Sequence, residues 1–235
     1  MLKTLEIVLF AIIVLLVVSI IYLIYLYFKA KDSNKKIFDL ILAEGYKNKV
    51  KLFEELNKYV KPNGVVFIGD SITQDYNVYE FYPNLTVYNR GIGGDTTLGL
   101  LKRLNCSVFD LNPSKVVLLI GTNDLELLNP TKEELISNIE KIIFEIKSFN
   151  EKIEIILLSI LPVNKNMSKI TVGKRNNEVI KNVNEGLSKL ENVKFVNIFK
   201  SLEEDGLLKE EYSVEGLHIN EKGYEVITKT LEKEL

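Results

Sequence analysis

The 235-residue sequence has one cysteine and one histidine, and both scarcities restrict its chemistry. Because Cys106 is the only thiol, no disulfide can form within the chain. Because His218 is the only imidazole, a histidine-rich metal site is excluded, and any histidine-dependent chemistry has to use this residue. We therefore expect no metal cofactor.

The sequence also lacks an excess of charge of either sign. Its 30 basic and 32 acidic residues give a formal net charge of -2. A nucleic-acid-binding protein needs a basic patch or stripe, and this balance does not indicate one, so we expect no nucleic-acid partner. There is no internal repeat and no low-complexity segment, and the length fits one sizeable globular domain with an additional segment.

One segment has no charge at all. Residues 7–28 contain no Asp, Glu, Lys or Arg, and as a helix they would be about 33 Å long, enough to cross a bilayer core of about 30 Å. Three tyrosines near the C-terminal end fit the aromatic belt of a membrane interface. The segment is too long for a signal peptide, and no small-x-small cleavage site follows it. We expect a retained transmembrane anchor over residues 1–30.

The remaining sequence predicts a helix followed by alternating strands and helices. Residues 33–60 place apolar side chains at helical spacing, and a Pro-Asn-Gly turn ends this helix, so we assign residues 31–62 to a helical connector. Five apolar runs of strand length follow, at residues 65–68, 85–88, 116–120, 153–160 and 195–198. Strands that alternate with helices predict a parallel, doubly wound α/β sheet over residues 63–235.

Two of the predicted helices have explicit capping signals at their first residues. Thr131 is followed three residues later by Glu134, which makes a capping box and predicts a helix through about residue 148. Asn220 precedes the last segment with helical periodicity and is a favoured N-cap residue.

Polar and glycine-rich motifs follow the predicted strands. Gly-Asp-Ser at residues 69–71 follows the first strand, a glycine-rich loop at 91–94 follows the second, and Gly-Thr-Asn-Asp at 121–124 follows the third. Glu-Gly-Leu-His at 215–218 precedes the last helix. Because the carboxyl ends of parallel strands lie on one edge of the sheet, where ligands bind in α/β folds, we expect these motifs to converge.

The four motifs supply the groups that acyl transfer needs. Ser71 would be the nucleophile, and His218 would take its proton and return it to the leaving group. Glu215, three residues before the histidine, can orient the imidazole and stabilise its charged form. The backbone N–H groups of Ser71 and Gly94 and the side-chain amide of Asn123 can donate to a developing oxyanion.

Other interpretations of the single motifs fit less well. The loop 91–94 has Thr96 where a dinucleotide-binding loop needs a third glycine, so we expect no such cofactor. Thr73 stands where an α/β-hydrolase elbow has its second glycine. We interpret Cys106 as a core residue. Three acidic residues are interpreted as carboxylates that brace loops: Asp70, Asp95 and Asp124.

In their order along the chain, these motifs resemble the sequence blocks of the SGNH, or GDSL, hydrolase family. The resemblance covers residues 64 to about 225, and the loop 89–97 is particularly similar to the branch that includes platelet-activating-factor acetylhydrolase catalytic subunits. It implies a flavodoxin-like, three-layer α/β/α sandwich with a five-stranded parallel sheet and metal-independent serine esterase chemistry.

The resemblance also implies roles for individual residues. Ser71 would be nucleophile and oxyanion donor, Gly94 and Asn123 would be the other oxyanion donors, and His218 would be the base. The chain departs from the family at one position, because the family usually has aspartate where Glu215 stands.

The sequence thus predicts a membrane-anchored serine carboxylic-ester hydrolase that cleaves acyl or acetyl esters. Two alternatives stay open: an acyltransferase with an acceptor other than water, and a non-catalytic carbohydrate- or lipid-binding module on the same fold. Lysophospholipids, acetylated cell-wall glycans and small acyl esters all remain candidate substrates. Substrate specificity would depend on loops such as 72–84 and 164–171, whose sequences do not indicate which ester is bound.

Two observations disagree about the side of the membrane on which the C-terminal domain lies. Four lysines follow the apolar segment, whereas only one precedes it, and this bias would keep the C-terminal domain in the cytoplasm. Large domains, however, translocate largely regardless of charge. The resembled family favours the extracytoplasmic side, which is where we expect the domain.

Overall fold

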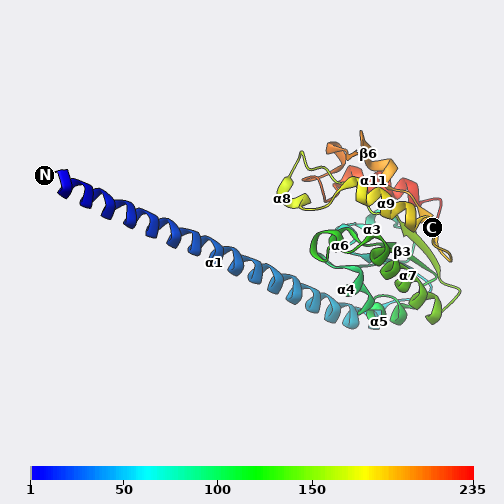
Figure 1. Cartoon of the computed structure of the whole chain (residues 1–235). Helices are drawn as coiled ribbons and strands as arrows, with labels where there is room; N and C mark the ends of the chain where they lie inside the picture. Colours follow the sequence, from blue (N-terminus) through cyan, green and yellow to red (C-terminus); the bar gives the residue numbers. More distant parts are fainter. Residues whose placement is uncertain (1) are drawn as a thin grey trace. The chain divides into compact units, whose positions relative to one another are not determined.

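A single helix, α1 (Leu2–Leu56), opens the chain in this computed structural model, which describes residues 2–235 (Figure 1). The side chains of residues 7–28 are all exposed, and the helix is long and apolar enough to cross a membrane. Membrane anchors and signal sequences share this property, because both need a long uncharged segment.

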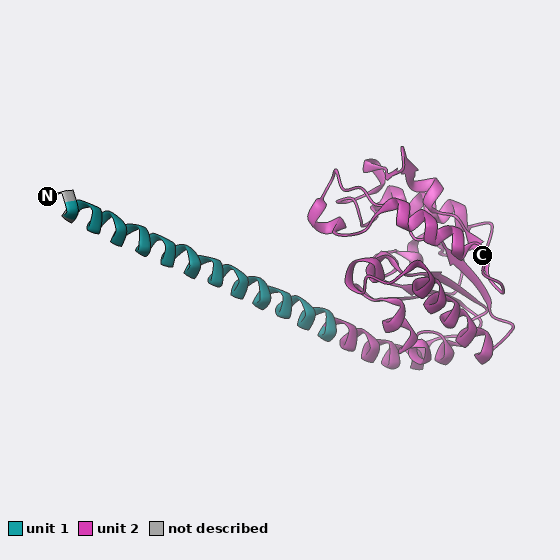
Figure 2. Ribbon diagram, in the orientation of Figure 1, with its two compact units in different colours: residues 1–44 teal, residues 45–235 magenta. Residues whose placement is uncertain are grey.

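Helix α1 continues without a break through the predicted connector and past Gly45. A 3-10 turn, η1 (Asn57–Tyr59), follows it. The chain divides into two compact units after Glu44, so the last turns of α1 belong to the second unit (Figure 2). The division into residues 1–30, 31–62 and 63–235 stays a prediction.

The second unit is built on a five-stranded parallel sheet with the order β2-β1-β3-β4-β5, which is the flavodoxin-like order. Its strands are β1 (Val65–Gly69), β2 (Val87–Gly91), β3 (Lys115–Leu119), β4 (Glu154–Leu158) and β5 (Lys194–Val196). All five residues of β1 are buried, as expected of a central strand covered on both faces. The five predicted strands are confirmed, with ends that differ by up to three residues.

Helices cover both faces of the sheet, and two apolar cores lie between the layers. Alternate strand residues point to opposite faces, so Val66 and Ile68 join one core while Val65 and Phe67 join the other. The first core is completed by α4 (Thr97–Leu101), α5 (Leu104–Ser107), α7 (Lys132–Phe149) and α9 (Asn177–Leu187). The second is completed by α2 (Ser71–Gln74), α3 (Val78–Phe81) and α11 (Glu221–Leu231). The predicted three-layer α/β/α sandwich is confirmed.

Shorter elements connect these layers. They are η2 (Phe109–Leu111), α6 (Thr122–Leu127), α8 (Lys169–Val172), α10 (Phe199–Leu202), the hairpin of β6 (Glu203–Glu204) with β7 (Leu207–Leu208), and η3 (Glu210–Tyr212). Both predicted caps are confirmed: Thr131 and Glu134 form a reciprocal capping box, and the Asn220 side chain accepts from the Gly223 N–H.

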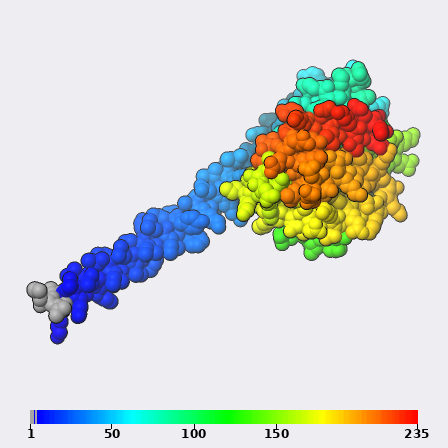
Figure 3. Space-filling view, turned by 90° about the horizontal axis from the view of Figure 1, so that it is seen from above, coloured from blue at the N-terminus to red at the C-terminus, as the bar shows by residue number. Residues whose placement is uncertain are grey.

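The last helix lies against the segment that follows β1, as the red and blue-green atoms of Figure 3 show. The Tyr224 hydroxyl donates to the Ile72 carbonyl at 2.7 Å, and the rings of Tyr76 and Tyr224 stack with centroids 4.8 Å apart. Residues far apart in the sequence are therefore locked together beside Ser71, which opens α2.

Candidate active site

The predicted site residues gather at the carboxyl ends of three neighbouring strands. Ser71 directly follows β1 and opens α2, Gly94 lies in the loop after β2, and Asn123 stands in the first turn of α6 after β3. His218 returns to the same edge from the loop before α11. Strand order therefore brings together residues that are up to 147 positions apart.

A chain of short contacts joins Ser71, His218 and Glu215. The Ser71 Oγ lies 3.1 Å from the His218 Nε2, and the His218 Nδ1 lies 2.7 Å from the Glu215 Oε1. The same Glu215 oxygen accepts the His218 backbone N–H at 3.0 Å. One carboxylate oxygen therefore holds both the ring and the backbone of the histidine, which fixes the direction in which the imidazole points.

The turn between Glu215 and His218 depends on Gly216. Its φ of +93° is a conformation that favours glycine, and a Cβ at this position would overlap the Asn164 carbonyl oxygen. The Gly216 carbonyl accepts the Asn164 N–H at 2.7 Å, and its own N–H donates to the Ser213 Oγ at 2.7 Å. The turn between Glu215 and His218 is thus held in place by hydrogen bonds to Asn164 and Ser213.

The three predicted oxyanion donors are available for a ligand. Among residues 2–235, the backbone N–H groups of Ser71 and Gly94 donate to no other protein group. The Asn123 Nδ2 donates one hydrogen to the Asp95 carbonyl at 3.0 Å, which leaves its second hydrogen. Gly94 has a φ of +76°, so glycine is the favoured residue at this bend of the loop.

Comparison with known proteins decides the family. The model of the GDSL-like Lipase/Acylhydrolase family matches residues 67–226, which contain all of these groups. The chain belongs to this family. The predicted resemblance is therefore confirmed.

Relatives of this GDSL-family protein include platelet-activating-factor acetylhydrolases. It is 32% identical over 177 residues to the platelet-activating factor acetylhydrolase IB subunit alpha2 of Homo sapiens, covering 73% of this chain and 75% of that protein. A solved Streptococcus pneumonia structure named after platelet activating factor is 34% identical with a TM-score of 0.80, covering 85% and 96% of the two chains. A GDSL-like lipase of Bacteroides thetaiotaomicron is 25% identical with a TM-score of 0.68, covering 79% and 96%.

Arg175 orients the Asn123 amide of the GDSL-family site. Its buried guanidinium donates from Nη2 to the Asn123 Oδ1 at 2.8 Å and from Nε to the Thr122 carbonyl at 3.0 Å. Because the amide oxygen is held this way, the amide nitrogen faces the opposite direction. The sequence interpretation missed Arg175, since nothing nearby in the sequence distinguishes it from a surface arginine.

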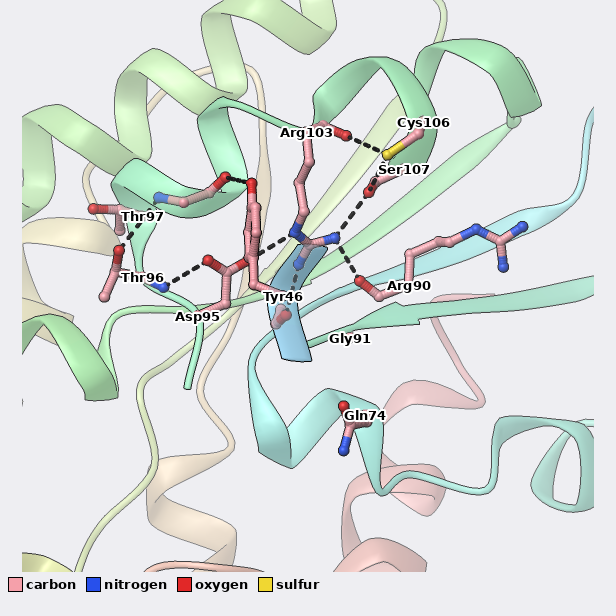
Figure 4. Close-up of polar contacts among 12 residues, drawn as sticks. Tyr46, Gln74, Arg90, Gly91, Asp95, Thr96, Thr97, Arg103, Cys106 and Ser107 are labelled. Atoms are coloured by element: carbon pink, nitrogen blue, oxygen red, sulfur yellow. Dashed lines mark hydrogen bonds and ion pairs between the residues drawn. The ribbon is translucent and has the colours of Figure 1, made fainter. Parts of the chain in front are cut away.

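Arg103 is a second arginine that the sequence interpretation missed. Its side chain is buried and donates to the Gly69 carbonyl at 2.9 Å. It also donates to the Arg90 carbonyl at 2.7 Å, to the Asp95 carboxylate at 2.7 Å and to the Ser107 Oγ at 2.8 Å (Figure 4). It therefore ties the end of β1, two residues before Ser71, to the loop after β2.

The three acidic residues interpreted as loop braces each accept a backbone N–H. The acceptors and donors are Asp70 with Ile72, Asp95 with Thr96, and Asp124 with Thr97. The Thr97 hydroxyl also donates to Asp124. These carboxylates thus hold the loops around the site, and within residues 2–235 no group of three or more His, Cys, Asp or Glu is placed to hold a metal ion.

Asp70 differs from the other two because its second oxygen is unpaired. The residue is 1% exposed, its Oδ1 accepts the Ile72 N–H at 3.0 Å, and its Oδ2 has no hydrogen-bond partner among the described residues. Burial raises the pKa of the Asp70 carboxyl to about 7.

We expect Asp70→Asn to flatten the pH dependence of stability. With a raised pKa, the folded protein keeps a proton on Asp70 that the unfolded chain, with an ordinary pKa of 3.8, releases. The free energy of unfolding of the wild type should therefore fall as pH rises from about 4 to about 7, by at most about 4 kcal/mol. Asparagine keeps the acceptor for Ile72 and does not titrate.

Thermal unfolding of both proteins in detergent between pH 4 and pH 8 measures this effect. The variant should gain stability relative to the wild type with rising pH up to about pH 7, and the difference should then be constant. A difference that is the same at every pH would contradict the assignment.

Proposed function

We propose that this GDSL-family protein is a serine carboxylic-ester hydrolase that works without a metal. The observation that carries the proposal is the continuous contact path from the Ser71 Oγ through the His218 imidazole to the Glu215 carboxylate. A serine hydroxyl is a weak nucleophile by itself, and this arrangement supplies both the base and the group that orients the base.

In the proposed reaction, the Ser71 Oγ attacks the ester carbonyl carbon while its proton passes to the His218 Nε2. The tetrahedral intermediate then collapses, the carbon–oxygen bond to the alcohol breaks, and His218 returns the proton to the leaving oxygen. A water molecule, deprotonated by the same imidazole, next attacks the carbonyl carbon of the acyl-Ser71 ester. The bond from that carbon to the Ser71 Oγ then breaks, His218 returns the proton to the Oγ, and the carboxylic acid is released. The Glu215 carboxylate, 2.7 Å from the His218 Nδ1, would stabilise the imidazolium.

The negative charge of each tetrahedral intermediate would be bound by three donors. These are the N–H groups of Ser71 and Gly94 and the free N–H of the Asn123 amide. Such donors stabilise the charge best when they do not have to reorganise, and each is worth about 10²–10³-fold in kcat. The hydrogen bond from Arg175 to Asn123 and that from Asn123 to Asp95 support this requirement, because they hold the amide in place before a substrate binds.

The names of the relatives favour a substrate ester whose acyl group is acetyl or another short chain. The acetylhydrolase subunit matches nearly three quarters of this chain. We therefore propose that the preferred substrate is a short-chain ester, and a panel of esters with increasing acyl length tests this. Labelling by a fluorophosphonate probe separates an enzyme from a non-catalytic binding module, and product analysis with added alcohols separates hydrolysis from acyl transfer.

We further propose that the apolar part of α1 is a retained single-pass anchor with the second unit on the extracytoplasmic side. The uncharged residues 7–28, their exposure and the missing cleavage pattern after them support retention. The location of the second unit is proposed from the family alone.

Ser71→Ala should lower ester hydrolysis by about 10⁴-fold or more while the fold is unchanged, because the attacking oxygen is lost. The measurement is kcat for a p-nitrophenyl ester with purified full-length protein in detergent. Ser188→Ala is the matched control, because Ser188 is exposed and lies at the end of α9. Near-wild-type turnover by Ser71→Ala would exclude the proposed mechanism.

Glu215→Gln should lower kcat less than Ser71→Ala does, by about 10-fold to 10⁴-fold, since the amide can still accept from the backbone but no longer stabilises an imidazolium. Glu215→Asp should retain more activity if the turn relaxes around the shorter side chain. Measured kcat values for both variants test the role. Wild-type activity in Glu215→Gln would show that another group orients His218.

A chain that begins at Lys31 should be soluble and active, because it lacks the uncharged segment and keeps the whole second unit. The full-length chain should instead remain in the membrane fraction after a high-salt wash. Solubility and kcat of the two proteins are compared. A full-length chain recovered in the soluble fraction would argue against an anchor.

A further inference from the structure

The last turns of α1 belong to the second unit and pack against the loop that contains Gly94. Phe53 is 4% exposed and forms a small apolar cluster with Ile92 and Cys106, and the partly buried Tyr46 and Val50 border it. This cluster is separate from the two cores of the sandwich. Ile92 stands two residues before Gly94, so the helix packs against the first part of the loop.

Tyr46 adds a polar contact to this apolar one. Its hydroxyl donates to the Gly99 carbonyl at 2.9 Å, across 53 residues of sequence (Figure 4). Gly99 lies in α4, whose N-cap Thr96 follows the loop. The two contacts of α1 therefore lie on either side of Gly94, one at Ile92 and one at Gly99.

Arg90 and Asn57 tie the end of α1 to β2 and α5. The Arg90 guanidinium lies 4.9 Å above the centre of the Phe53 ring, and its Nη2 donates to the Asn57 Oδ1 at 2.9 Å. The Asn57 Nδ2 donates to the Cys106 carbonyl at 2.7 Å. The 3-10 turn that follows α1 is thus bonded to β2, which leads into the loop, and to α5.

The supported loop is joined directly to the proposed oxyanion donors. Asp95, next to Gly94, is held by Arg103 through its carboxylate, and its carbonyl accepts from the Asn123 amide. The loop has two adjacent glycines, at 93 and 94, which have no side chains to pack. Its conformation must therefore be fixed by neighbouring elements.

We propose that Tyr46 and Phe53 of α1 are positioning residues for residues 92–99, which comprise the loop after β2 and the first residues of α4. The assignment rests on the proposed function, since the loop matters for catalysis only if Gly94 and Asn123 bind an oxyanion. Displacement of a catalytic group by about 1 Å can cost on the order of 10²-fold in rate. Tyr46 and Phe53 would therefore act on the reaction through the loop, without contact to the substrate.

The test compares kcat and KM of full-length variants in detergent. Tyr46→Phe removes one hydrogen bond and should lower kcat about 3- to 10-fold, whereas Phe53→Ala empties the cluster and should lower kcat about 10- to 100-fold. KM should change less than about 2-fold, because the donors act mainly on the transition state. Phe53→Leu, which keeps most of the apolar volume, should restore most of the activity.

Matched controls come from the same stretch of the chain. Tyr59→Phe changes a tyrosine that is 83% exposed, and Leu52→Ala changes an apolar residue that is 45% exposed and outside the cluster. Both should keep wild-type kcat. Circular dichroism shows whether each variant is folded at the assay temperature.

Amide hydrogen exchange of peptides covering residues 92–99 gives a readout that does not need activity. Exchange should be faster in Tyr46→Phe and Phe53→Ala than in the controls. If the wild type hydrolyses no ester while exchange rises in these variants, the proposed function fails and the support of the loop by α1 stands. Unchanged kcat and unchanged exchange in both folded variants would overturn the inference, as would equal losses in the controls.

Discussion

The site depends on one buried cation, the Arg103 guanidinium. The residue is 2% exposed, and an isolated charge at such a depth costs several kcal/mol unless it is paired and hydrogen-bonded. Arg103 meets this condition by binding acceptors on three separate pieces of chain, at the ends of β1 and β2 and in the loop that follows β2. Those pieces cannot shift independently without leaving part of the charge unpaired, which fixes Ser71 relative to Gly94.

Arg175 plays the same role for the residues that follow β3. It holds the Asn123 oxygen and the Thr122 carbonyl, while the Asn123 nitrogen reaches the Asp95 carbonyl. Three loops that follow three different strands are therefore joined by the side chains of Arg103 and Asn123, and Arg175 holds the Asn123 amide. Oxyanion donors need this rigidity, because a donor that has to reorganise during the reaction loses much of its electrostatic advantage.

The parts that sequence could predict are those with local patterns. Apolar runs located all five strands, Thr131 and Asn220 located helix starts, and motif order led to Ser71, Gly94, Asn123, His218 and Glu215. The two arginines and Tyr46 could not be predicted, because their contacts with Gly69, Asn123 and Gly99 span 34, 52 and 53 residues and a buried arginine has no local signature. Cys106, interpreted as a core residue, is buried, but the cluster around it includes a helix end that looked like a connector.

Helix α1 shows how one continuous element serves two environments. In residues 7–28 every side chain is uncharged and exposed, which is the pattern of a helix that an apolar surrounding stabilises. From Tyr46 onward, Tyr46, Val50 and Phe53 pack with Ile92 and Cys106, whereas Leu52 and Leu56 are exposed. Removing the Phe53 ring would uncover the cluster and leave Tyr88 as the remaining aromatic partner of Arg90. The division between the two compact units follows Glu44, inside the helix and well before the first strand.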